Sequence, residues 1–144
     1  MTGEEIQALL GAQRAFFNSG ATLSVDFRIK SLRRLYDAVK AHEGDIHAAL
    51  TADLGKSAYE GFMCESGLAL TEISYMIKHT RKLARRTTVR TPLAQFASHS
   101  FTQAMPYGNT LIMSPWNYPF LLTIDPLADA IAAGNTVILK PSAY

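Results

Sequence analysis

Cysteine is nearly absent from this 144-residue chain, in which Cys64 is the only one. One thiol cannot form a disulfide within the chain, so a disulfide-rich secreted domain is excluded and a reducing compartment is favoured. Long apolar runs are lacking too, since none approaches the ~20 residues that a helix needs to cross a bilayer. The first five residues are acidic and do not begin a signal peptide. We therefore expect a cytoplasmic protein with no membrane segment in this chain.

An excess of charge of one sign is also missing. The chain has 14 Lys and Arg against 12 Asp and Glu, a formal net charge of +2, which does not by itself imply a polyanionic partner. Residues 78–90 are locally basic and could touch nucleic acid, but no nucleic-acid-binding motif accompanies them. We interpret them as a solvated helix end, where cations complement the helix dipole, and expect no nucleic-acid partner. The four histidines lack the spacing of metal ligands, so we expect no metal site.

Apolar side chains recur at helical spacing through the first part of the chain, between breaks rich in Gly, Asn, Asp and Ser. The pattern predicts a helix that Ser24 caps, and a shorter one that Asp45 caps. Cys64 falls within the last helix with no histidine or basic cluster beside it, so we interpret it as a buried structural thiol rather than a nucleophile. The expected helices cover residues 3–18, 24–43, 45–52 and 57–86.

The pattern changes to β-favouring residues at 87–106, which predict a loop and then an extended or edge strand. Residues 110–113 and 136–139 are continuous apolar runs, typical of strands covered on both faces. Residues 123–133 between them read as a helix, closed by Gly134 and Asn135. A strand, a helix and a strand in this order form a crossover that joins two parallel strands.

These elements define the expected fold class, which is α/β. N-terminal helices are followed by an extended arm and by the first βαβ unit of a doubly wound, Rossmann-like domain. We divide the chain into a helical segment (1–90), an arm or oligomerisation strand (91–107) and the start of a dinucleotide-binding domain (108–144). Two short strands leave open edges and make a poor sheet by themselves. We therefore expect a truncated piece of a larger protein, and association with another copy.

Polar residues follow both predicted strands, at the edge where open parallel sheets bind ligands. Residues 114–119 form a loop that two prolines stiffen, and Asn117 on such a loop could donate its amide to a developing oxyanion. The alternative is an ordinary loop whose Trp116 packs in the core. Lys140, after the second strand, could offer its ammonium group to ribose or phosphate, or could be a solvated lysine.

Five segments of the sequence resemble those of a known family, the aldehyde dehydrogenases. The resemblance covers essentially the whole chain, and the Trp-Asn-Tyr-Pro-Phe form favours the class-3, fatty-aldehyde-like branch. The segments that carry it are residues 53–56 (Asp-Leu-Gly-Lys), 106–108 (Pro-Tyr-Gly), 116–120 (Trp-Asn-Tyr-Pro-Phe), 126–135 (Pro-Leu-Ala-Asp-Ala-Ile-Ala-Ala-Gly-Asn) and 139–142 (Leu-Lys-Pro-Ser).

The resemblance implies NAD(P)-dependent oxidation of aldehydes to carboxylic acids, an aldehyde substrate, NAD or NADP as cofactor, and a homo-oligomer, such as a dimer. It implies that Asn117 is the oxyanion donor and that Lys140 holds the adenosine ribose. The residues implied in cofactor binding are Met113, Ser114, Pro115, Trp116, Asn117, Lys140 and Ser142.

Several features of the family are missing from this sequence. It has no Gly-Gln-x-Cys nucleophile context, no Leu-Glu-Leu-Gly-Gly general base and no Gly-Ser-x-x-x-Gly pyrophosphate turn. We therefore expect this chain to be the N-terminal part of such an enzyme and to be inactive alone. The alternative is a non-catalytic fragment or pseudoenzyme that serves assembly. Ala143 stands where the family usually has Glu, which weakens the case for strict NAD preference.

Overall fold

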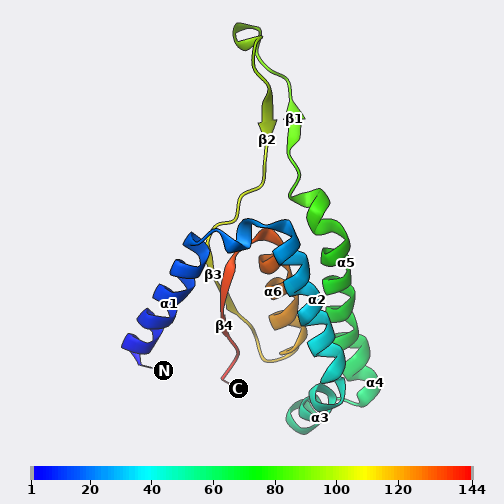
Figure 1. Ribbon diagram of the computed structural model, residues 1–144. Coiled ribbons are helices and arrows are strands. Elements are labelled where there is room, and N and C mark those ends of the chain that lie inside the picture. The colour runs from blue at the N-terminus through cyan, green and yellow to red at the C-terminus, as the bar shows by residue number, and fades with distance from the viewer. Residues whose placement is uncertain (1, 144) are drawn as a thin grey trace.

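A computed structural model describes residues 2–143 and shows a short strand pair with α1 on one side and the other helices on the opposite side, with a hairpin projecting away (Figure 1). Within these residues no helix is both long and apolar enough to cross a membrane. The α-helices are α1 (Gly3–Asn18), α2 (Val25–Ala41), α3 (Glu43–Leu54), α4 (Ala58–Gly61), α5 (Gly67–Leu83) and α6 (Leu121–Ala133). The strands are β1 (Thr87–Val89), β2 (Ser100–Thr102), β3 (Asn109–Met113) and β4 (Thr136–Lys140).

The predicted helices are present, with two differences. The Ser24 side chain caps α2 by accepting from the backbone N–H of Phe27, as expected. Asp45 does not cap a helix: α3 already begins at Glu43, and the Asp45 carboxylate lies in its first turn, 3.0 Å from Nδ1 of His42. A negative charge there still suits the positive end of the helix dipole.

The second difference is in the long helix predicted over residues 57–86. A π-helical turn at Phe62–Ser66 separates α4 from α5, and α5 ends at Leu83. An added Cβ on Gly67 would lie 2.7 Å from the carbonyl oxygen of Phe62, so the turn needs a glycine after it. Cys64 lies in this turn and is half-buried rather than buried.

The core lies where α2, α5 and α6 meet. Leu32 and Ile73 are fully buried there, with Ala128 and Ala132 of α6 packed against them. The small residues of α6 let the larger side chains of α2 and α5 approach it closely. Burial of a leucine or isoleucine side chain stabilises the fold by roughly 1.5–3 kcal/mol, so these contacts fix α6 relative to the helices.

Residues 87–102 form an antiparallel hairpin rather than a loop followed by one extended strand. Thr87 pairs with Thr102 and Val89 with Ser100, and the hairpin projects from the helical body (Figure 1). Leu93 and Phe96 at its tip are 89% and 85% exposed. The hairpin is therefore an arm whose apolar tip is exposed among the described residues.

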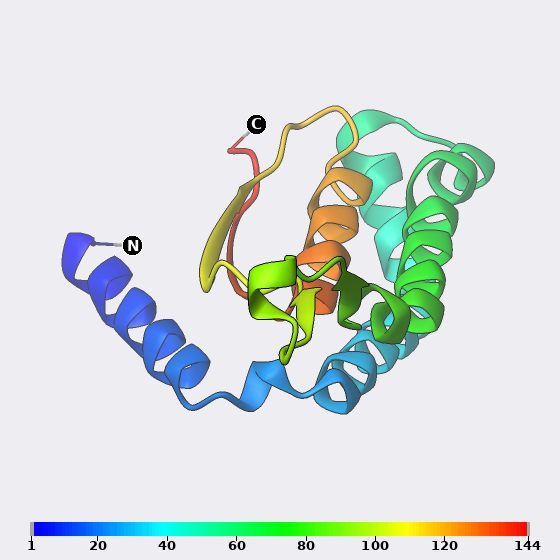
Figure 2. The same ribbon diagram turned by 90° about the horizontal axis from the view of Figure 1, so that it is seen from above.

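β3 and β4 pair in parallel, as the strand-helix-strand pattern predicts. The helix between them, α6, begins at Leu121, two residues before the predicted start. It covers one face of the pair, while α1 lies on the other side (Figure 2). The chain is thus α/β, with helices on both sides of the start of a parallel sheet.

Candidate functional site

The carboxyl ends of β3 and β4 meet at one edge, as expected. Met113 pairs with Lys140 in the register of the two strands, and the backbone N–H of Ser114 donates to the carbonyl oxygen of Lys140 over 3.3 Å. The loop at residues 114–119 and the segment after Lys140 therefore start side by side. Both predicted groups of site residues lie at this edge of the sheet.

The loop after β3 is fastened to the first turns of α6. The Thr123 hydroxyl lies 2.6 Å from both the Ser114 hydroxyl and the carbonyl oxygen of Pro119, and Ser114 is buried. Trp116 is 57% exposed, so the alternative in which it packs in the core is wrong. The loop thus presents its middle to solvent while its ends are fixed.

A buried ion pair bonds to the same loop on the side away from solvent. The sequence did not predict this pair. Nζ of Lys56 donates to the Glu65 carboxylate, and the two residues are 8% and 0% exposed. The same ammonium donates to the carbonyl oxygen of Asn117 over 3.0 Å and lies 4.1 Å from the centre of the Tyr118 ring.

The other oxygen of Glu65 binds the start of α6. Oε2 accepts from the backbone N–H of Phe120 at 3.0 Å and from that of Leu121 at 2.9 Å. A carboxylate at this position satisfies two N–H groups that have no partner within the helix. One ion pair therefore contacts the loop at Asn117 and at the residues where the loop becomes α6.

Local structure places both members of the pair. Gly55 ends α3 with a positive φ of 67°, and the Thr51 hydroxyl donates to the carbonyl oxygen of Lys56 over 2.7 Å. Glu65 lies in the π-helical turn. The sequence signal was the run at residues 53–56, which reads as a break between helices but gives no hint of a partner for its lysine.

The remaining predicted site residues are more open. Asn117 and Lys140 are exposed, and Ser142 is half-buried. Pro115 is exposed beside Trp116. Lys140 presents an exposed cation at the strand end, while Asn117 has a hydrogen-bonded backbone carbonyl and an exposed side chain.

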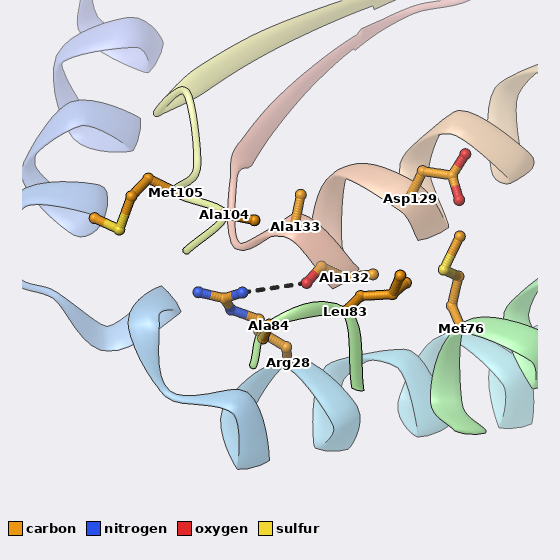
Figure 3. Close-up of a pocket in the computed structure, with 9 residues that line it drawn as sticks. All are labelled: Arg28, Met76, Leu83, Ala84, Ala104, Met105, Asp129, Ala132 and Ala133. Carbon is orange, nitrogen blue, oxygen red and sulfur yellow. Dashed lines mark hydrogen bonds between the residues drawn. The ribbon is translucent and has the colours of Figure 1, made fainter. Parts of the chain in front are cut away.

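A separate small cavity of about 170 Å³ lies at the opposite end of α6, beneath the stem of the hairpin (Figure 3). Its most polar member, Arg28, is committed to backbone carbonyl oxygens, at 2.6 Å to Thr22 and 3.3 Å to Ala132 and Leu23. Burial lowers the pKa of Arg28. The residue stabilises the end of α6, and the cavity contains no predicted site residue.

Three carboxyl groups gather where α5 faces α6. Burial, then the charges of Glu72 and Asp129, raise the pKa of Asp125 to about 6. Burial also raises the pKa of Glu72 and of Asp129, although a hydrogen bond from Glu72 opposes the change at Asp129. Among the described residues, none of the three carboxyl groups forms a hydrogen bond or ion pair with the loop at residues 114–119, and we call them the acidic seam.

Comparisons with known proteins agree with the resemblance. The profile of the aldehyde dehydrogenase family matches residues 1–144. The chain is 43% identical over 129 residues to 4,4'-diaponeurosporen-aldehyde dehydrogenase of Staphylococcus aureus, covering 90% of this chain and 28% of that one. It is 42% identical over 139 residues to the dimeric NADP-preferring aldehyde dehydrogenase of Canis lupus familiaris, covering 96% and 30%. Other relatives from mouse, rat and Arabidopsis thaliana are named as members of aldehyde dehydrogenase family 3, so the class-3 prediction is confirmed.

The fold agrees as well. The chain superposes on the substrate-bound state of Staphylococcus aureus AldH with a TM-score of 0.92 and 42% identity, over 95% of this chain and 30% of that one. The chain therefore spans about 30% of the length of the relatives that it matches. In these relatives the matched part is the N-terminal portion, which includes part of the Rossmann-like domain.

Proposed function

Because the chain belongs to the aldehyde dehydrogenase family, we propose that it forms the N-terminal part of an enzyme that oxidises aldehydes to carboxylic acids with NAD or NADP. The observation that carries the proposal is the juxtaposition of two strand ends. The register of Met113 with Lys140 brings an amide-bearing loop and an exposed cation to one sheet edge. This edge is where open parallel sheets bind ligands.

Asn117 is the proposed oxyanion donor. When a nucleophile from the remainder of the enzyme adds to an aldehyde, negative charge develops on the carbonyl oxygen. An amide N–H that is already oriented toward this oxygen stabilises the charge without reorganisation. The backbone of Asn117 is held by its carbonyl oxygen, 3.0 Å from Nζ of Lys56, and this contact places the Cα from which the amide extends.

The chemistry of the donors at this edge fits a dinucleotide. Lys140 has three rotatable N–H donors for ribose hydroxyls or a phosphate, and Ser142 adds a hydroxyl nearby. The backbone around Met113 to Trp116 would line the nicotinamide-ribose channel. The bound cofactor would supply hydride acceptance, and these residues would bind and orient it. The relative from dog is described as NADP-preferring, which is compatible with Ala143 in this chain.

The hairpin β1–β2 is the proposed contact between subunits. Its apolar tip is exposed, and a second copy would bury this surface and pair open strand edges. The relative from dog is described as dimeric. The proposed assembly is a homodimer. The proposed location is the cytoplasm, because the single cysteine of this chain suits a reducing compartment.

The test is a steady-state assay of the complete enzyme with a panel of aldehydes and NAD or NADP, following the reduced nicotinamide. Asn117→Ala should lower kcat by about 10²–10³, the typical cost of losing one oxyanion donor. Its circular dichroism spectrum should match that of the wild type. A kcat near the wild-type value in a folded variant would overturn the assignment of Asn117.

A further inference from the structure

Two energetically costly features converge on the loop that carries Asn117. The first is the ion pair of Lys56 and Glu65, which is almost completely shielded from solvent. Desolvation costs several kcal/mol for each buried ion, and apolar residues of similar volume often serve stability equally well. The second is the π-helical turn at Phe62–Ser66. Such turns are rare and occur frequently at functional sites.

The turn explains how a carboxylate reaches this place. One extra residue in the turn shifts the register of the side chains, and Glu65 and Ser66 are both fully buried in it. Nε2 of His47 lies 2.9 Å from the Ser66 hydroxyl and anchors the turn to α3. Glu65 is thereby held between Lys56 and the start of α6.

The ion pair bonds to three backbone atoms between residues 117 and 121, where the loop becomes α6. These are the carbonyl oxygen of Asn117, which accepts from Lys56, and the N–H groups of Phe120 and Leu121, which donate to Glu65. A fixed carbonyl oxygen sets the plane of the peptide bond after Asn117. This contact limits movement of the backbone at Asn117, and so it holds in place the Cα from which the exposed side chain extends.

We propose that Lys56 and Glu65 are positioning residues that orient the Asn117 amide for the transition state. The inference rests on the proposed function, because it needs Asn117 to act as the oxyanion donor. Neither residue touches the reacting atoms. Their effect is to hold the donor within the small tolerance that catalysis allows, where a misplacement of about 1 Å can cost roughly 10²-fold in rate.

The experiment is a double-mutant cycle in the complete enzyme. Lys56→Met keeps an unbranched side chain but removes both the donor to Asn117 and the cation that faces Tyr118. It should lower kcat about 10- to 100-fold in folded protein, with a much smaller change in the KM for NAD(P). In an Asn117→Ala background the same substitution should change kcat less than about twofold, because no amide remains to be positioned. Lys40→Met is the matched control, since Lys40 makes an exposed ion pair with Glu43 at 3.9 Å, and its kcat should equal that of the wild type.

The outcomes separate the two claims. An Asn117→Ala enzyme with near-normal kcat refutes the proposed function itself. A slow Asn117→Ala enzyme together with a folded, fully active Lys56→Met enzyme refutes only the positioning role. Equal fold losses from Lys56→Met in both backgrounds would also overturn it, because the effect would not pass through Asn117. If Lys56→Met does not fold, Glu65→Gln is measured with the same expectation, and failure of both to fold would assign the pair to folding alone and overturn the inference.

Discussion

The ends of β3 and β4 lie side by side, yet the chain treats them differently. After β3, the loop is bonded by Lys56, Glu65 and Thr123, and two of these groups are buried charges. After β4, the Lys140 side chain is exposed, and its backbone carbonyl oxygen accepts from the N–H of Ser114 in the neighbouring loop. We call the end of β3 the rigid end, because buried side chains bond to its loop. We call the end of β4 the open end, because its lysine is exposed.

The difference matches the two kinds of work proposed for them. An oxyanion donor must point at a charge that exists only in the transition state, so its orientation must be set beforehand. A lysine that binds ribose or phosphate acts as a point charge on a flexible stem and needs little preorganisation. The costly buried polar groups are therefore placed behind Asn117 and not behind Lys140.

Removing Glu65 should have the largest effect on the rigid end. Glu65→Ala leaves the Lys56 ammonium buried without its counter-ion and the N–H groups of Phe120 and Leu121 without an acceptor. We expect the free energy of unfolding of the complete enzyme to fall by about 3–5 kcal/mol, the usual cost of breaking a buried ion pair. Urea unfolding measures it, and Glu43→Ala, which breaks the exposed pair with Lys40, should cost less than about 1 kcal/mol. Equal losses in the two variants would contradict this.

Gly134 joins α6 to β4, the strand that carries Lys140 at its far end. It tests how tightly the end of α6 packs against Arg28. It has a φ of 91°, and an added Cβ would lie 2.5 Å from the Arg28 guanidinium carbon. Gly134→Ala should cost about 1–2 kcal/mol in backbone strain and more from displacing Arg28 from Ala132. Gly20→Ala is the control, because Gly20 has a φ of 76° and its nearest contact is 3.9 Å away. Urea unfolding should show the larger loss for Gly134, and identical losses would mean that Arg28 moves aside freely.

Ala143 lies three residues after Lys140 and tests which cofactor the open end accepts. A carboxylate at this position would repel a 2′-phosphate by about 1 kcal/mol in water and about 4 kcal/mol at an effective dielectric of 20. Alanine removes this repulsion, so the complete enzyme should accept NADP as well as NAD. Ala143→Glu should raise the KM for NADP about tenfold and leave that for NAD nearly unchanged. An unchanged ratio would place the choice of cofactor on residues elsewhere.

The smallest effect concerns the acidic seam between α5 and α6. Burial, with the charges of Glu72 and Asp129, raises the pKa of Asp125 from 3.8 to about 6, so the folded protein takes up a proton more readily than the unfolded chain. The contribution of Asp125 to stability is therefore most favourable below about pH 4 and is lost as the pH rises through 6. Asp125→Asn should raise the free energy of unfolding at about pH 8 by roughly 1 kcal/mol, allowing for solvent screening, and change it little at about pH 4. A gain of the same size at both pH values would show that the charge is not responsible.

The sequence predicted the parallel pair and its helix because the signals there are local. Continuous apolar runs at residues 110–113 and 136–139 are bounded by proline and glycine, and Gly134 ends α6 with the left-handed conformation expected of such a residue. The hairpin was only half predicted, because β1 and β2 each have three residues and the turn between them is long. Short exposed strands leave little alternation to detect.

The rigid end could not be predicted in the same way. Lys56 and Glu65 lie nine positions apart, but they act on residues 117–121, which only tertiary packing brings near them. The π-helical turn breaks the 3.6-residue period by one residue, and its local signs are the two glycines that flank it within a helical pattern, Gly61 and Gly67. Buried polar partners are set by the folded chain, so spacing along the sequence does not reveal them.

The most direct test of the central claim compares Asn117→Ala with Lys140→Met in the complete enzyme, with kcat and the KM for NAD(P) measured in both. We expect Asn117→Ala to lower kcat by about 10²–10³ and to change the cofactor KM little. We expect Lys140→Met to raise the cofactor KM about tenfold, while kcat at saturating cofactor stays within about threefold of the wild type. A similar loss of kcat in both variants, with the cofactor KM unchanged in both, would contradict the division of chemistry and binding between the two strand ends.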